Sequence, residues 1–415
     1  MPADNYPARR APAGQRAVRR QNLRLVLRHV SRNGKSSRAQ LASATGLTKA
    51  TVSSLVAELL DAYLLIELGP EPRGLTGRPG SALALNPDRY AGIGLEINVD
   101  YVAACVTDLK HRIRYHHVEC ADNRADAKIA LDRLARLGSV AIRAAHEMEL
   151  TPCGITLALP GIVDQVTGRL LRAPNLNWTD LPVVESLGDR LDVRPEEIHL
   201  DNEANLAALG ELWFGGGEAL GDFIHVSGEI GIGAGIVTRR ALYRGARGFA
   251  GEIGHISIDP SGELCGCGGR GCLERFCGQE AMLRAAGLPP AAPATSTGDP
   301  GGPISGLLAA LQRGEQQAIR AVRQGGEALG IGLAGVANVV DPDTIVLGGI
   351  FTPLASWLME PFTAALLRQT VVTRWAPPRV AVSSLGPQAA VRGAAGSVVQ
   401  RILADPSLFI SGEEE

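Results

Sequence analysis

One histidine and three cysteines lie close together in the sequence, at His255, Cys265, Cys267 and Cys272. Three thiols and one imidazole are the four ligands that a closed tetrahedral zinc site needs, and the intervening glycines permit the tight turns that would bring them onto one ion. A closed site leaves no position open for water, so no hydrolytic centre is implied. A redox-active cysteine pair and a chance grouping are the competing interpretations. Cys277 is near enough in the sequence to be a substitute ligand.

A second group of polar side chains follows the apolar run at residues 198–200, which predicts a strand. Asp201, Asn202 and Glu203 come directly after it and lead into a predicted helix over 206–212. Ligands commonly bind at the carboxyl ends of strands in α/β sheets, so these carboxylates and amides are candidates for binding hydroxyl groups. Capping of the helix by Asp201 or Asn202 is the structural alternative, and both roles can operate together.

The elements that must position these residues alternate between strands and helices. The apolar runs predict strands at 95–97, 101–107, 155–159, 198–200, 223–226, 344–347 and 380–382, with helices at 126–147, 206–212, 319–340 and 389–403. Such alternation predicts an α/β architecture in which the sheets are at least partly parallel.

The first part of the chain has a different pattern, that of three short helices. Apolar residues at helical spacing predict a first helix through Val30, and Ser37 with Gln40 forms a capping box that starts a second. Gly46 breaks the second helix, and Thr48 can cap a third. Two short helices joined by a tight turn with glycine are typical of a helix-turn-helix.

The start of the third helix carries small polar side chains away from its apolar face, at Lys49, Ala50, Thr51, Ser53 and Ser54. Such residues suit a helix N-terminus that enters the major groove of DNA. Two alternating runs, at 64–68 and 82–85, predict a β-hairpin wing, whose loop carries Arg73 and Arg78 for contacts with phosphate or the minor groove. A helical bundle that only packs against the rest of the chain is the alternative.

The composition of the chain limits the number of domains, the class of protein and the expected compartment. The 415 residues should form two or three domains, and 45% hydrophobic with 20% charged residues is ordinary for a soluble globular protein. No apolar run approaches a membrane span of about 18 residues, and no signal-peptide core follows the basic start. Seven cysteines are too few for a disulfide scaffold, so a reducing cytoplasm is expected. The net charge is −2, but Asp4 is the only acidic residue before residue 40, which suggests a polyanionic partner for that segment.

With these motifs in place, the sequence resembles the ROK family of repressors, open reading frames and sugar kinases, over essentially its whole length. The resemblance is carried by the segments 252–255 and 265–274, supported by 159–164 and 202–205. It implies an actin-like, two-lobed α/β fold of the ribonuclease-H-like class with a sugar in the cleft between the lobes. The winged helix-turn-helix in front resembles the repressor branch.

The resemblance also implies roles for individual residues. Zinc would be held by His255, Cys265, Cys267 and Cys272. The hydroxyls of a monosaccharide of the xylose or glucose class would be bound by Asn202, Glu203, Glu252, His255 and Glu274. Such a role suits their chemistry, because carboxylates accept hydrogen bonds from hydroxyls and an amide can donate or accept. His255 would belong to both sites, with one ring nitrogen on each.

The sequence departs from the family's kinases at three places. Their Asp-x-Gly-Gly-Thr phosphate loop corresponds here to residues 96–100, Glu-Ile-Asn-Val-Asp, which lack the glycines and add negative charge. Their catalytic Asp corresponds to Glu203, which is one methylene longer. Their second phosphate loop, Gly-Thr-Gly, corresponds to Gly228-Glu229-Ile230. We therefore expect phosphoryl transfer to be lost and sugar binding to be kept.

We expect a basic flexible arm at 1–19, a winged helix-turn-helix domain at 20–88, a ROK domain at 89–405 and an acidic tail at 406–415. The ROK domain should have two lobes, 89–200 with the C-terminal helix, and 201–385. The leading hypothesis is a sugar-responsive regulator, most simply a repressor of carbohydrate-utilisation genes, that binds operator DNA as a homodimer or homotetramer. The alternatives are an ATP-dependent sugar kinase with an added DNA-binding domain, and a regulator that answers to a protein partner.

Overall fold

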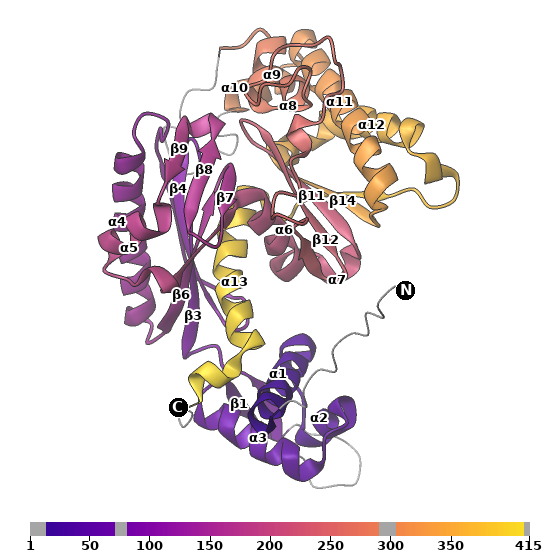
Figure 1. The fold of residues 1–415 in the computed structure, drawn as a ribbon. Coiled ribbons are helices and arrows are strands. Elements are labelled where there is room, and N and C mark those ends of the chain that lie inside the picture. Colours follow the sequence, from indigo (N-terminus) through magenta and orange to yellow (C-terminus); the bar gives the residue numbers. More distant parts are fainter. Residues whose placement is uncertain (1–13, 71–80, 290–303, 411–415) are drawn as a thin grey trace, which may run out of the picture. The chain divides into compact units, whose positions relative to one another are not determined.

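The computed structural model describes residues 14–70, 81–289 and 304–410. The chain forms two compact units, one made of Met1–Tyr90 and Val399–Glu415, the other of Ala91–Val398 (Figure 1). We call them the N-terminal unit and the α/β unit, and describe each by itself.

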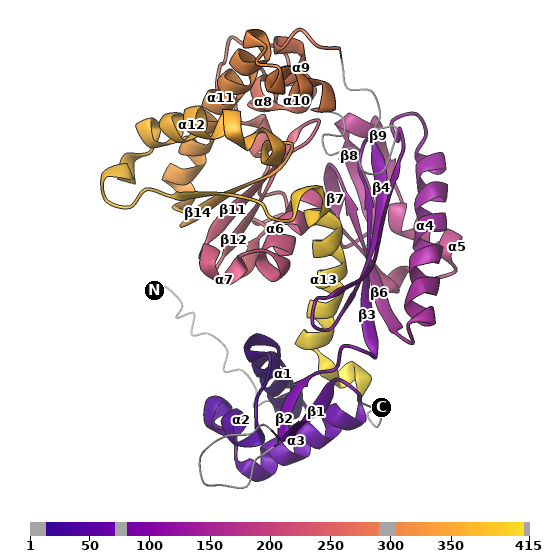
Figure 2. The same cartoon turned by 180° about the vertical axis from the view of Figure 1, so that it is seen from behind.

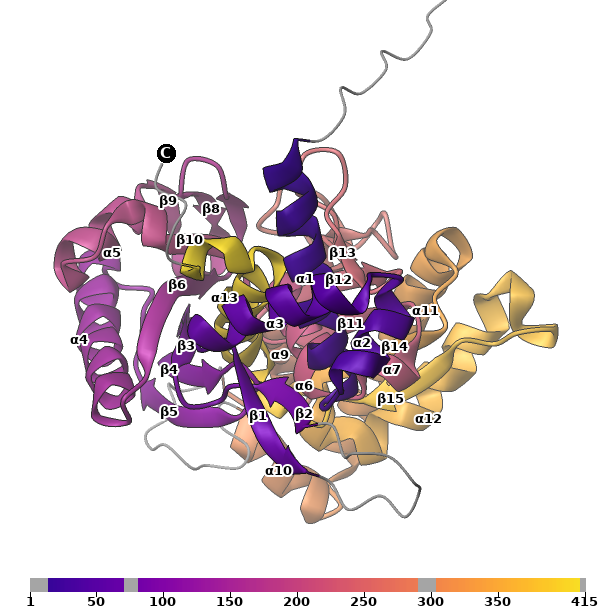
Figure 3. The same ribbon diagram turned by 90° about the horizontal axis from the view of Figure 1, so that it is seen from below.

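The N-terminal unit contains three helices and a two-stranded sheet. Its elements are α1 (Gln15–Asn33), α2 (Arg38–Thr45), α3 (Lys49–Asp61), β1 (Leu65–Pro70), β2 (Ser81–Leu85) and the 3₁₀ turn η7 (Pro406–Phe409). Figure 3 shows the three helices beside the antiparallel β1–β2 pair. The apolar stripe of α1 is buried as its spacing predicts, at Leu23, Val26, Leu27 and Val30. The unit therefore has a small core of its own, with the helix-turn-helix and wing arrangement.

The predicted helix ends are confirmed residue by residue. Ser37 and Gln40 form the capping box, in which the Ser37 amide donates to Gln40 Oε1 at 2.8 Å and the Gln40 amide donates to Ser37 Oγ at 3.3 Å. Gly46 adopts a left-handed φ of 71° at the end of α2, a conformation that glycine takes without steric cost. Thr48 then caps α3 by accepting from the Thr51 amide at 3.1 Å.

Both ends of the expected domain scheme need correction. Helix α1 begins at Gln15, so residues 15–19 are helical rather than part of a flexible arm, and Arg19 pairs with Glu58 of α3 at 2.7 Å. At the other end, residues 406–409, the first part of the expected acidic tail, form η7. The Phe409 ring stands edge-on to Tyr90 at 5.0 Å, and aromatic packing of this kind orders a segment that composition alone assigns to solvent.

The first lobe of the α/β unit is a five-stranded sheet in the order β10-β6-β3-β4-β5. The strands are β3 (Tyr90–Ile97), β4 (Tyr101–Asp108), β5 (Ile113–Cys120), β6 (Thr151–Leu159) and β10 (Ile198–Asn202). Helices α4 (Ala127–Glu147) and α5 (Val183–Leu191) cover one face, and α13 (Ala389–Ala404) lies on the other (Figures 1 and 2). Gly92 and Gly94 allow this, because a Cβ at either position would collide with the α13 backbone at Ala395 or Val391.

A smaller three-stranded sheet, not expected from the sequence, joins the first lobe. It consists of β7 (Ile162–Asp164), β8 (Arg169–Ala173) and β9 (Trp178–Leu181). The short 3₁₀ turns η1 (Pro174–Leu176) and η2 (Pro195–Glu197) connect it and β10 to their neighbours.

The second lobe has a five-stranded sheet in the order β13-β12-β11-β14-β15. The strands are β11 (Phe223–Gly228), β12 (Ile232–Thr238), β13 (Ala241–Tyr243), β14 (Thr344–Gly349) and β15 (Arg379–Val382). Its helices are α6 (Glu203–Phe214), α7 (Gly217–Leu220), α8 (Glu274–Cys277), α9 (Gln279–Ala285), α10 (Ser305–Gln312), α11 (Gln316–Val340) and α12 (Phe351–Gln369), with 3₁₀ turns η3 (Ile253–His255), η5 (Val371–Arg374) and η6 (Gly386–Gln388). Side chains alternate along the sheet, so that Ile224 packs with α11 and α12 while Phe223 packs with α6.

The pairing confirms the prediction of partly parallel sheets. Strand β10 runs parallel to β6, and β11, β14 and β15 are mutually parallel, while the hairpins β3-β4-β5 and β11-β12-β13 are antiparallel. The carboxyl ends of β10 and β11 therefore present residues 201–203 and 227–229 to the space between the two sheets. In the parts of the chain that are described, none of the helices combines the length and the apolar character needed to cross a bilayer.

Candidate functional site

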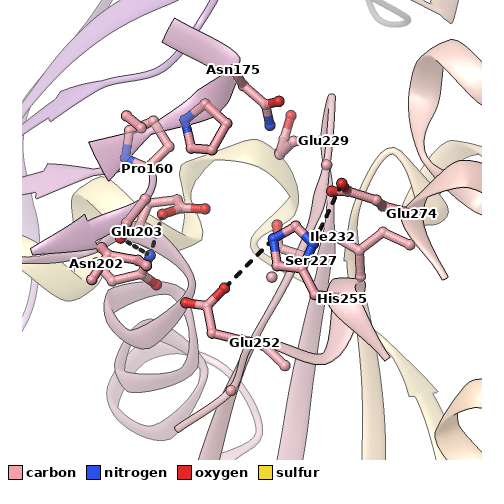
Figure 4. A pocket seen from close by; sticks show the side chains of 18 of the residues that line it. Pro160, Asn175, Asn202, Glu203, Ser227, Glu229, Ile232, Glu252, His255 and Glu274 are labelled. Carbon is pink, nitrogen blue, oxygen red and sulfur yellow. Dashed lines mark hydrogen bonds and ion pairs between the residues drawn. The ribbon is translucent and has the colours of Figure 1, made fainter. Parts of the chain in front are cut away.

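A cavity of about 440 Å³ opens between the two five-stranded sheets of the α/β unit, and its volume is within the range of small-molecule sites. The first lobe contributes Asn98, the turn at Pro160 and Gly161, and the end of β10. The second lobe contributes the turn between β11 and β12 and the segment 248–255. Figure 4 shows the polar side chains that face this space.

Asn202, at the end of β10, and Glu203, at the start of α6, lie next to each other on one wall of the cavity, and Asn202 has two roles at once. Its Oδ1 accepts from the amides of Ala204 at 2.9 Å and Asn205 at 3.2 Å, which caps α6. Its Nδ2 donates to Glu203 Oε2 at 2.8 Å and to the Gly161 carbonyl at 3.0 Å. The capping role and a place on the cavity wall, which the sequence offered as alternatives, therefore coexist.

Three further predicted residues, Glu252, His255 and Glu274, meet on the opposite wall. His255 Nε2 lies 3.9 Å from Glu252 Oε2, and its Nδ1 lies 3.5 Å from Glu274 Oε1 (Figure 4). Burial raises the pKa of Glu252, while the nearby His255 lowers it. The imidazole thus connects two carboxylates, one at each ring nitrogen, and the structure brings all five predicted sugar-site residues to one cavity.

The cysteine cluster lies behind His255. The Nδ1 of His255 is 3.7 Å from Cys265 Sγ, and the sulfurs of Cys267 and Cys272 are 3.6 Å apart. One ligand atom from each of the four residues can be chosen so that all lie within 4.8 Å of one another, a unique combination among groups of histidine, cysteine and acidic residues in the described chain. Three sulfurs and one nitrogen converging in this way fit a tetrahedral metal ion.

The remaining cysteines stand outside this cluster. Cys277 is buried, its thiol donates to the Leu273 carbonyl at 3.4 Å, and it is not part of the group whose ligand atoms converge. Cys105 is also buried, whereas Cys120 and Cys153 are only half-buried.

Two features of the site were not foreseen as such. Arg244, after β13, forms a bidentate ion pair with Asp201, with Nη1–Oδ1 at 3.1 Å and Nη2–Oδ2 at 2.6 Å. Burial also raises the pKa of three glutamates that lie near one another, Glu96 to about 7, Glu203 to about 8 and Glu229 well above its ordinary value. Sequence reasoning treated the glutamates one at a time, and nothing in the sequence links Arg244 to Asp201.

The predicted DNA-reading residues lie at the start of α3. The side chains of Lys49, Ala50, Ser53 and Ser54 are exposed, while Thr51 is half-buried and its hydroxyl shares a hydrogen bond with Thr48 at 2.9 Å. Arg73 and Arg78, the predicted wing contacts, lie outside the described residues.

A family model described as the ROK family matches residues 92–401. The chain belongs to the ROK family. This ROK protein is 29% identical to the xylose repressor of Caldicellulosiruptor bescii over 391 residues, which are 93% of this chain and 97% of that protein. It is 31% identical to the glucokinase of Streptomyces coelicolor over 314 residues, which are 73% of this chain and 96% of that enzyme.

The fold of this ROK protein also matches a crystal structure titled as a ROK family transcriptional regulator, a homolog of the E. coli MLC protein. The TM-score is 0.76 at 23% identity, and the match covers 95% of this chain and all of the other. The likeness establishes the actin-like ROK fold with an N-terminal helical region, as the sequence predicts.

Proposed function

We propose that this protein is a sugar-responsive, DNA-binding transcriptional repressor of carbohydrate-utilisation genes, acting in the cytoplasm. One observation carries the proposal. The similarity to a xylose repressor runs over 93% of the chain, whereas the similarity to a glucokinase takes in nearly the whole enzyme and only 73% of the chain. The family model begins at residue 92, so the N-terminal unit with its helix-turn-helix is what this chain adds to the α/β unit that it shares with the glucokinase.

The effector is a monosaccharide of the xylose or glucose class, bound in the cavity between the lobes. Asn202, Glu203, Glu252, His255 and Glu274 bind its hydroxyls. The volume of about 440 Å³ and the opposed carboxylates support this assignment, because adjacent hydroxyls donate to carboxylates and the Asn202 amide can donate as well as accept.

Zinc is the metal that the cluster of His255, Cys265, Cys267 and Cys272 holds. A bound zinc ion would cross-link the segment 265–272 to His255 and so fix the imidazole from its Nδ1 side. His255 Nε2, on the other side of the ring, remains directed toward Glu252 and the cavity. The metal therefore has a positioning role for the sugar-binding wall.

The same unit does not act as a kinase in this proposal. Glu96 and Glu229 stand at the positions of the family's phosphate loops, and each lies near enough to Glu203 for their charges to interact. A triphosphate would have to enter a buried region in which burial and mutual repulsion already raise the pKa values of the carboxyl groups, so that further negative charge is disfavoured there. The second candidate, a sugar kinase with an added DNA-binding domain, draws support from the 31% identity to a glucokinase. ATP turnover over a panel of sugars, well above background, would favour that candidate.

Sugar and DNA are coupled through the arrangement of the lobes. A sugar that binds one arrangement more tightly shifts the population toward it, and the free energy available for this shift is the difference between its two affinities. A homodimer or homotetramer places two helix-turn-helix units on half-sites about one helical turn of DNA apart, or a multiple of it. The Lys49–Ser54 end of α3, with Arg73 and Arg78, makes the DNA contacts.

The deciding experiment combines a sugar panel with one variant. Xylose or glucose should raise the melting temperature of the zinc-loaded protein and change its affinity for operator DNA. Glu252→Gln should abolish both sugar effects and leave operator binding intact, and Glu147→Gln, an exposed carboxylate at the end of α4, is the control. If no sugar binds and operator affinity stays constant, a regulator that answers to a protein partner replaces the present proposal.

A further inference from the structure

The polar residues of the cavity account for the hydroxyl groups of a sugar, but not for the rest of its surface. A pyranose ring also carries C–H groups on its faces, and small-molecule sites combine apolar and aromatic side chains with a few polar groups. Among the described residues that line the cavity, Phe249 is the only aromatic one. Phe249 is 44% exposed, so its apolar surface is available to a ligand in the cavity.

Phe249 lies in a short loop, residues 245–249, that is held at both ends. Before the loop, Arg244 is fixed by its ion pair with the end of β10, and its carbonyl accepts from the Ala250 amide at 3.1 Å. After the loop, the Gly251 carbonyl accepts from an amide of β12 at 3.2 Å. Residues 245–249 themselves are all exposed. The loop is therefore anchored next to the cavity, while Phe249 remains uncovered.

The second anchor joins Phe249 to the carboxyl group of Glu252, which is close to it in the sequence and lines the same cavity. Gly251 lies between the two with a φ of 109°, a conformation that residues with a side chain rarely adopt. A Cβ at Gly251 would also collide with the Ala234 carbonyl oxygen of β12. The turn at Gly251 thus places an aromatic side chain and a hydroxyl-binding carboxyl group on one stretch of the cavity wall.

We propose that Phe249 forms the apolar wall of the sugar site and packs its ring against a C–H face of the bound monosaccharide. This inference rests on the proposed sugar-binding function and adds one residue to the site. The carboxyl groups of Glu203, Glu252 and Glu274 bind hydroxyls at the edge of the sugar ring, whereas Phe249 removes its C–H face from water. The sugar in turn covers the exposed surface of Phe249, and the burial of both apolar surfaces favours binding.

The test is a calorimetric titration of the full chain with xylose and with glucose. Phe249→Ala should weaken the binding of the sugar at least about tenfold, and Phe249→Leu, which lacks a flat ring, at least about threefold. Phe249→Tyr keeps the ring and should keep the affinity within about twofold. Trp375→Ala removes an exposed aromatic side chain that does not line the cavity, and should bind the sugar as the unchanged protein does.

Phe249→Trp supplies a second readout, one that a purely structural role of this position would not move. The emission of the new indole should change when the sugar binds. Acrylamide should quench it less in the sugar-bound state, because the sugar covers the ring. The same titration of the unchanged protein, which has four tryptophans of its own, gives the background to subtract.

Two results overturn the inference. One is sugar binding by Phe249→Ala or Phe249→Leu within about twofold of the unchanged protein, since no aromatic wall would then be needed. The other is an indole emission in Phe249→Trp that does not respond to a bound sugar. If Phe249→Ala does not fold, as judged by circular dichroism, Phe249→Leu and Phe249→Trp decide. If the unchanged protein binds neither xylose nor glucose, the proposed function itself fails, so the two failures are distinguishable.

Discussion

Arg244 holds Asp201 by two hydrogen-bonded contacts across the space between the lobes, with Nη1–Oδ1 at 3.1 Å and Nη2–Oδ2 at 2.6 Å. Asp201 lies in β10 of the first-lobe sheet, and Arg244 follows β13 of the second. The Asp201 carboxylate is almost fully buried and also accepts from the Asn205 amide group at 3.3 Å. The pair therefore ties one lobe to the other at the edge of the cavity.

Arg244→Ala should lower the free energy of unfolding by about 2–3 kcal/mol, since it leaves a buried carboxylate without its cation, with some discount for the partial exposure of Arg244. It should also weaken sugar binding, because Asp201 precedes Asn202 directly. Chemical denaturation and calorimetric titration measure the two effects. Arg247→Ala, an exposed arginine of the same loop, is the matched control. Equal stability of the two variants would show that the ion pair contributes nothing.

Cys272→Ser should release the proposed zinc ion and lower the melting temperature strongly, because structural zinc contributes directly to folding free energy. Metal content by atomic absorption and a thermal melt provide the measurements. Cys153→Ser, at a half-buried cysteine outside the cluster, should keep both values. Full zinc content in the Cys272 variant would contradict the assigned ligand set.

The free energy of unfolding should decrease as the pH rises. The pKa of Glu96 rises from 4.5 in the unfolded chain to about 7 in the folded one, and that of Glu203 to about 8. The folded state keeps protons that the unfolded state has lost, so the free energy of unfolding decreases from about pH 4.5 to about pH 8, by about 3 kcal/mol for Glu96. Burial lowers the pKa values of His111 and His225 to about 4. Below about pH 6.5 these two histidines therefore make the free energy of unfolding increase as the pH rises, the opposite of the glutamate contribution.

The difference between the parent chain and Glu96→Gln isolates this contribution, since both histidines are present in each. Urea denaturation across the interval should show a flatter profile for the variant and an unchanged one for Glu147→Gln. Parallel profiles for all three proteins would mean that Glu96 titrates normally.

Lys49→Ala should weaken operator binding and reduce the slope of log affinity against log salt concentration by about one, as expected for the loss of one phosphate contact. Lys49 is exposed at the first position of α3, so its replacement leaves the core of the N-terminal unit untouched. Lys110→Ala, an exposed lysine of the other unit, is the control. An unchanged salt slope would remove Lys49 from the DNA contacts.

What the sequence predicted well rests on short-range patterns. The capping box at Ser37 and Gln40, the turn at Gly46 and the cap at Thr48 involve neighbours within a few residues, so spacing alone was sufficient. Most strands of the two five-stranded sheets were likewise visible as apolar runs, but β12 and β13 were not. The same applies to the cysteine cluster, in which Cys265, Cys267 and Cys272 occupy one tight segment.

The features that the sequence did not predict depend on contacts between segments that are far apart in the chain. Helix α12 contains Pro361, a residue that lacks an amide donor and argues against a continuous helix, yet packing against α11 stabilises it. The partner of Asp201 comes from a loop after β13, and no local pattern identifies it. Glu96 and Glu229 were interpreted separately as obstacles to phosphate binding, because only the folded chain brings both to the wall of one small void of about 10 Å³.

Helix α13 belongs to both units, since the boundary at Val398 and Val399 falls inside it. The first part of α13 packs on Gly92 and Gly94. In the segment that follows the helix, the Phe409 ring contacts Tyr90 and Asp405 forms an ion pair with Arg20. A gene fragment that ends near residue 90 would therefore encode the N-terminal unit without the C-terminal residues that pack against it. A frameshift near residue 385 would remove α13 and the residues after it, and would therefore disrupt both units.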